Sequence, residues 1–117
     1  MGLDMYLYTD KSVDPEKKID DEEALAYWRK CYPIDDYFRM MGSRINEYGS
    51  LFYVSRHTLE VLLQNCLDIY IGKKDSKTFF YDSSREIYEG ELKDTIEQLA
   101  NLLHERPNSR FIYLADW

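Results

Sequence analysis

The side chains of this chain that could do chemistry are two histidines, two cysteines and several groups of carboxylates. A nucleophilic site needs a cysteine or serine beside a histidine base. Cys66 and His57 fall on one expected helix, about 13 Å apart along its axis, so they cannot touch. Cys31 could meet His57 or His104 only through the fold, and no spacing in the sequence predicts such a pair. We therefore expect no catalytic residues and a protein that is not an enzyme.

The sequence also gives no support for a metal site or for redox chemistry. Neither His57 nor His104 has a cysteine or carboxylate at the spacing of a known metal site. His104, near the end of an expected helix, suits the helix dipole. Cys31 and Cys66 fall on apolar helix faces, which is typical of buried, reduced thiols. We expect no metal, no cofactor and no disulfide.

The net charge of the chain indicates which class of partner it can bind. The 117-residue chain has a formal net charge of −7, which disfavours direct binding to nucleic acid or to anionic lipid. An acidic protein suits partners with basic surfaces, including proteins that bind nucleic acid, although the charge could serve only solubility. No apolar run reaches the length of a membrane span, and no signal peptide opens the chain. We expect a cytoplasmic protein.

Runs of carboxylates form the first candidate site. Adjacent acids on a helix point in different directions, so adjacency does not make a catalytic pair. They serve either as a solvated face and dipole partners or, when spaced like phosphates, as contacts for the lysines and arginines of a basic partner. The candidate partner-binding residues are Asp20, Asp21, Glu22, Glu23, Asp35, Asp36, Glu91, Asp94 and Glu97.

The second candidate site is the run of residues 27–32, in which two aromatic side chains stand beside two cations. In one interpretation Trp28 and Phe38 are core residues, and the neighbouring cations pair with nearby acids. In the other, the segment is a cationic, aromatic edge that stacks on a base or nucleotide. The ligand-binding candidates are Tyr27, Arg29, Lys30 and Tyr32.

The best-defined structural pattern runs from Leu51 to Ile71. An aromatic strand signal over 51–54 meets Ser55, a suitable helix N-cap, and Gly72 suits a left-handed helix end. Between them, apolar residues recur at spacings of three and four, which predicts the central core helix. These residues are Leu59, Leu62, Leu63, Cys66, Ile69 and Tyr70.

The other elements follow from the same two periods. Alternation over residues 3–8 predicts a strand with aliphatic residues on one face and tyrosines on the other. Further strands are expected at 78–81 and 111–114, and helices at about 21–32, ended or kinked by Pro33, then at 34–41 and 91–105. The sequence thus predicts one α+β domain over residues 1–117, with a small, mainly antiparallel sheet of three or four short strands and three or four helices packed on one face.

The motifs resemble a group of small, uncharacterised proteins of bacteria and their phages. The resemblance covers the opening Met1 and Leu3–Tyr8, the Tyr-Trp-Arg-Lys of 27–30, the later Ile34 with its aromatic pair, and Phe52–Ser55 before a leucine-rich helix. This chain has Cys31-Tyr32 where the group has Ala-Asn, and Asp35 where it has histidine. A cysteine that the group often carries is missing between residues 46 and 50. The resemblance implies a mobile-element setting and no particular reaction.

Together these observations predict a non-enzymatic phage or prophage accessory protein that binds and inhibits a host protein. Like some anti-CRISPR proteins, it would act as an acidic decoy in the nucleic-acid channel of a defence nuclease. The alternative is a nucleotide-binding protein or sponge that uses residues 27–32. A hydrolase would need a cleft in which Asp35 or His57 meets another titrating group.

Overall fold

The computed structural model describes residues 2–9, 24–45, 50–81, 83, 85–107 and 110–116. The strands are β1 (Asp4–Thr9), β2 (Ala26–Arg29), β3 (Ser43–Arg44), β4 (Leu51–Ser55) and β5 (Arg110–Asp116). The helices are α1 (Tyr32–Met41), α2 (Arg56–Tyr70), α3 (Ser76–Phe79) and α4 (Glu89–Glu105). This arrangement confirms the predicted α+β class, with one more short strand than expected.

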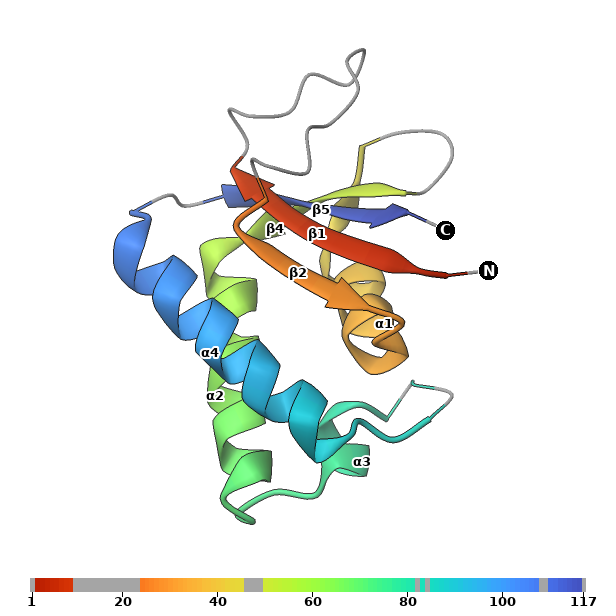
Figure 1. Ribbon diagram of the computed structural model, residues 1–117, viewed down its shortest axis with the longest axis vertical. Coiled ribbons are helices and arrows are strands. Elements are labelled where there is room, and N and C mark those ends of the chain that lie inside the picture. Colours follow the sequence, from red (N-terminus) through yellow and green to blue (C-terminus); the bar gives the residue numbers. More distant parts are fainter. Residues whose placement is uncertain are drawn as a thin grey trace.

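The sheet is antiparallel throughout and has the order β2-β1-β5-β4-β3. The first and last strands of the chain, β1 and β5, lie side by side near its centre. The long helices α2 and α4 lie together on one side of the sheet, and α1 lies on that side as well (Figure 1). In the described part of the chain, the helices α1, α2 and α4 therefore pack on one face of the sheet, as predicted.

Alternation along the strands places the core on the helical side. In β1, Met5 and Leu7 are completely buried, and Leu7 lies opposite Tyr113 of β5. Phe52 of β4 lies on the other side of Tyr113, so one row of buried side chains crosses three strands. Aliphatic residues of α2 and α4 pack on this row, among them Leu59, Leu62 and Leu99. Burial of this apolar area is the main stabilising contribution to the fold.

Helix α2 confirms the pattern predicted for the central helix. The Ser55 hydroxyl accepts a hydrogen bond from the Thr58 N–H at 3.1 Å, as an N-cap does. Gly72, with a φ of 83°, follows the last turn in the left-handed region that favours glycine. Cys66 is buried, whereas Tyr70, at the end of the apolar stripe, is exposed.

The helix predicted over 21–32 is wrong within its described part. Residues 26–29 form an edge strand in which Ala26 and Trp28 are buried while Tyr27 and Arg29 are exposed. The apolar positions fit a period of two as well as a helical one, and pairing with β1 decides between them. Pro33 lies in the first turn of α1, where a missing N–H costs nothing, so it begins a helix instead of ending one.

The strand predicted over 78–81 is also wrong. Its aromatic residues have high strand propensity, but Asp75 caps a short helix there by accepting from the Lys77 N–H at 3.0 Å. Phe79 then packs its ring against Tyr37 of α1, with the ring centres 5.2 Å apart. A local cap and one tertiary contact therefore outweigh the propensity of the segment.

Replacement of the α2 cap should destabilise the protein. Ser55→Ala removes the acceptor for the Thr58 N–H, and we expect the free energy of unfolding to fall by about 1 kcal/mol. Urea unfolding followed by circular dichroism measures the difference. Ser43→Ala, at an exposed serine of β3, is the control and should change it by less than about 0.5 kcal/mol. An equal loss in both variants would contradict the cap.

Candidate functional site

A stripe of polar side chains on α4 forms hydrogen bonds to β2, which contains part of the second candidate site, residues 27–32. Glu91, Thr95 and Gln98 are spaced four and three residues apart, so they share one side of the helix. The Gln98 amide donates to the Tyr27 carbonyl at 2.8 Å, and its oxygen accepts from the Tyr27 N–H at 2.7 Å. The Trp28 indole N–H donates to the Thr95 hydroxyl at 2.8 Å. The outer backbone of β2 is thus paired with a side chain of α4.

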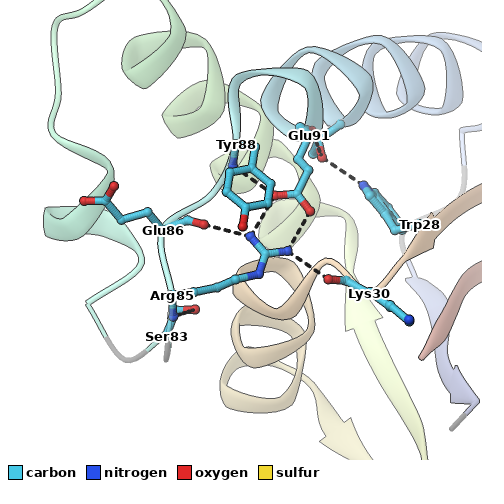
Figure 2. Close-up of polar contacts among 8 residues, drawn as sticks. Trp28, Lys30, Ser83, Arg85, Glu86, Tyr88 and Glu91 are labelled. Carbon is cyan, nitrogen blue, oxygen red and sulfur yellow. Dashed lines mark hydrogen bonds and ion pairs between the residues drawn. The ribbon is translucent and has the colours of Figure 1, made fainter. Parts of the chain in front are cut away.

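Arg85 completes the attachment at the N-terminal end of α4. Its two terminal nitrogens donate to the two oxygens of Glu91 at 2.9 and 2.7 Å. The same nitrogens donate to the carbonyl oxygens of Glu86, at 2.7 Å, and Lys30, at 2.8 Å. Figure 2 shows the guanidinium between Glu91 and Lys30, and its carbon lies 4.5 Å from the centre of the Tyr88 ring. Arg85 therefore ties residues 85–88 to α4 and to the end of β2.

The electrostatics of this cluster favour a structural ion pair over catalysis. Burial by itself would raise the pKa of Glu91, but hydrogen bonds from Arg85 and from the Tyr88 N–H outweigh it and lower the pKa. The hydrogen bond from Arg85 to Glu91 in turn raises the pKa of Arg85. Burial strongly raises the pKa of the nearby Cys31 thiol, and the negative charge of Glu91 raises it further. A protonated thiol beside a fully hydrogen-bonded carboxylate is neither a nucleophile nor a base.

The other side chains that could take part in a reaction do not belong to this cluster. Burial raises the pKa of Cys66 to about 12, so this thiol is also protonated at neutral pH. Within the described ranges, no group of three or more histidine, cysteine or acidic side chains could hold a metal ion. No helix in that part of the chain is long and apolar enough to cross a membrane.

The structure separates the predicted partner-binding acids into different environments. Asp20, Asp21, Glu22 and Glu23 lie outside the described residues. Asp94 and Glu97 are exposed on α4, Asp36 is half-buried on α1, and Glu91 is half-buried in its pair with Arg85.

The prediction that Asp35 binds a partner is wrong, because Asp35 is 2% exposed and cannot face a partner. Its carboxylate accepts from the Tyr113 hydroxyl, and from Arg39 at 2.8 Å. Burial raises the pKa of Tyr113, and the charge of Asp35 raises it further. Asp35 therefore joins α1 to the central strand β5. The apolar spacing around it gave a sign of this position, since Asp35 follows Ile34 on the side of α1 that faces the sheet.

The four ligand-binding candidates lie on different sides of the sheet edge. Tyr27 and Arg29 point to the side of β2 opposite Trp28, and the Tyr27 hydroxyl donates to Asp4 at 2.5 Å. Lys30 follows the strand with a φ of 53°. Tyr32 begins α1, and the Arg85 guanidinium lies 5.6 Å from the centre of its ring. The two tyrosines therefore belong to different elements, Tyr27 to β2 and Tyr32 to α1.

The sequence analysis did not identify the polar stripe or Arg85. The stripe adjoins the leucine stripe of α4 at the same helical spacing, and that spacing was the available signal. For Arg85, the partners Glu86 and Glu91 are near in the sequence, but the contacts with Lys30 and Tyr32 depend on the tertiary fold.

No family model matches the chain, and comparisons with curated proteins and with solved structures found no match either. The likeness to small phage and bacterial proteins therefore rests on the motifs alone.

The Arg85–Glu91 pair should stabilise the fold in a pH-dependent way. Because the pKa of Glu91 is lowered on folding, its contribution is complete above the ordinary glutamate pKa of about 4.3 and is lost as pH falls through the lowered value. Glu91→Gln should lower the free energy of unfolding by about 2 kcal/mol at neutral pH. The difference from wild type should shrink when urea unfolding is repeated at acidic pH.

The control for this experiment is Glu97→Gln, which neutralises an exposed carboxylate on the same helix. It should leave stability within about 0.5 kcal/mol of wild type at neutral pH. If Glu91→Gln behaved like Glu97→Gln at neutral pH, the ion pair would not be stabilising.

Proposed function

We propose that the protein binds a basic surface of another protein through the exposed carboxylates of α4. The observation that carries this proposal is the position of Asp94 and Glu97 on the outward side of that helix. Burial raises the pKa of Asp94, and the negative charge of Glu97 raises it further, which places these two carboxylates close enough to interact. Helix α4 carries five carboxylates and one lysine, Lys93, so its outer side has an excess of negative charge.

Carboxylates held on a helix can compete with nucleic acid for the same cations. Lysine and arginine side chains bind phosphate and carboxylate oxygens through the same charge-assisted hydrogen bonds. Since Glu91 is held inward by Arg85, the carboxylates offered to a partner are the exposed Asp94 and Glu97. Helix α4 packs on α2 and so presents these side chains from a rigid support, which lowers the entropic cost of binding.

The resemblance to phage and bacterial proteins supports a particular class of partner. An acidic accessory protein of a phage or prophage would act in the host cytoplasm on a protein that binds nucleic acid. A nuclease of a defence system has the basic channel that such carboxylates fit. Inhibition would then follow from occupation of the channel, without any enzymatic step.

The nucleotide-binding alternative at residues 27–32 receives no support from the geometry. Tyr27 and Arg29 lie on one side of β2, while Tyr32 lies beside Arg85. We therefore do not carry this alternative forward at these residues.

Neutralising the outer face should remove binding. We expect the wild-type chain to capture a basic, nucleic-acid-binding protein from host lysate at about 0.1 M salt and to lose it at about 0.5 M. Double-stranded DNA should release the captured protein, because DNA phosphates and the carboxylates of α4 compete for the same lysines and arginines of that protein. The double variant Asp94→Asn, Glu97→Gln should bind the purified partner at least about tenfold more weakly, as measured by calorimetry.

The control carries the same change in net charge elsewhere. Glu60→Gln with Asp116→Asn removes two exposed carboxylates outside α4. This control should bind like wild type if position matters and not only net charge. Equal weakening by both double variants, or a partner that DNA does not displace, would contradict the proposal.

A further inference from the structure

A pocket of about 290 Å³ is lined by residues of α3 and by Phe80, Tyr81, Ser83 and residues 85–87. Its lining includes no residue of α4, the helix proposed above to bind a protein. Its volume is at the lower end of the range of small-molecule sites, so it suits a ligand with one ring and one small polar group.

The walls of the pocket combine apolar and polar surfaces. Phe80 and Ile87, each 8% exposed, form its apolar part, and Tyr81, 69% exposed, stands at the rim. The Ser76 and Ser83 side chains add hydroxyl groups that can donate to an anion. Aromatic walls with a few convergent polar groups are the usual composition of a site for a planar ligand.

Two cations line the pocket, and they differ in availability. The terminal nitrogens of Arg85 are used by Glu91 and two carbonyl oxygens, so Arg85 serves as a fixed wall. Lys77 instead pairs with Glu86 at 3.1 Å, and both side chains are largely exposed, at 72% and 63%. An exposed ion pair contributes little stability, so a ligand anion can replace Glu86 on Lys77 at small cost.

The charged residues that line the pocket also favour an anion. Lys73 and Lys74 precede the pocket, and the carboxylate of Asp75 accepts from the backbone N–H of Lys77 as the cap of α3. Lys74 is held over the Phe79 ring, with its nitrogen 5.9 Å from the ring centre. The pocket lining itself holds the cations Lys77 and Arg85 against the carboxylate of Glu86, a balance that favours a small anion in an otherwise acidic protein.

We propose that this pocket binds a small anionic aromatic ligand, with its ring between Phe80 and Tyr81 and its anionic group on Lys77. The shared chemistry is one planar ring that bears one phosphate or carboxylate. This site is independent of the partner-binding face on α4, so either proposal can fail alone.

The test uses the full chain, ¹⁵N-labelled, in NMR titrations with four probes. Phenyl phosphate and benzoate carry a ring and an anion, phenol carries the ring alone, and inorganic phosphate carries the anion alone. We expect phenyl phosphate or benzoate to shift amide signals around residues 76–87, and the stronger of the two identifies the anionic group. Phenol and inorganic phosphate should bind at least about tenfold more weakly, because each lacks one half of the recognition.

Four variants, all at exposed positions, locate the contacts. Lys77→Ala should weaken the preferred probe by at least about tenfold, and Tyr81→Ala should weaken it by removing the ring contact. Glu86→Gln should tighten binding, because it frees Lys77 from its competitor. Lys93→Ala, at an exposed lysine of α4, is the matched control and should bind like wild type.

Three results would overturn the proposal. The first is the absence of shifts around 76–87 with both ring-bearing anions. The second is equal affinity for phenol or for inorganic phosphate, which would remove the anionic or the aromatic half of the site. The third is equal weakening by Lys77→Ala and Lys93→Ala, which would reduce the effect to net charge.

Discussion

The attachment of β2 to the polar stripe of α4 is the constraint on which the rest of the sheet edge depends. An edge strand exposes backbone groups that need partners, and Gln98 pairs with both polar groups of Tyr27. Thr95 receives the Trp28 indole N–H, which fixes the large side chain that β2 buries. Arg85 extends this attachment through Glu91 to the Lys30 carbonyl. Side-chain hydrogen bonds thus hold a four-residue strand against the sheet, where strand propensity alone would be weak.

The same helix uses its carboxylates in two opposite ways. Glu91 points inward and accepts hydrogen bonds from Arg85 and from the Tyr88 N–H, so its charge is neutralised and its role is structural. Asp94 and Glu97 are exposed, and burial raises the pKa of Asp94, which the negative charge of Glu97 raises further. The difference comes from what the fold places opposite each carboxylate, since Arg85 and the Tyr88 N–H lie against Glu91. A stabilising and an interacting carboxylate therefore occupy one short stretch of α4.

Much of the fold could be predicted because local signals and burial agree there. In α2 the Ser55 cap, the apolar spacing and Gly72 all indicate the same helix. The helix predicted over residues 21–32 is wrong in its described part because the apolar residues there fit both periods, and only pairing with β1 selects the strand. The strand predicted over residues 78–81 is wrong because the cap at Asp75 and the contact of Phe79 with Tyr37 outweigh strand propensity. Local patterns are thus reliable where no tertiary contact competes with them.

The sequence by itself determined the α+β class, the two long helices, the central strands and the acidic character of the protein, since composition and period encode these directly. The tertiary structure alone decided which charges meet. It buried Asp35 beside Tyr113, paired Glu91 with Arg85, and left Asp94 and Glu97 outside. It also formed a pocket from residues of two segments around α3. The reason is physical: whether a carboxylate is a core partner or a surface charge depends on what the fold places opposite it, and that neighbour is distant in the chain.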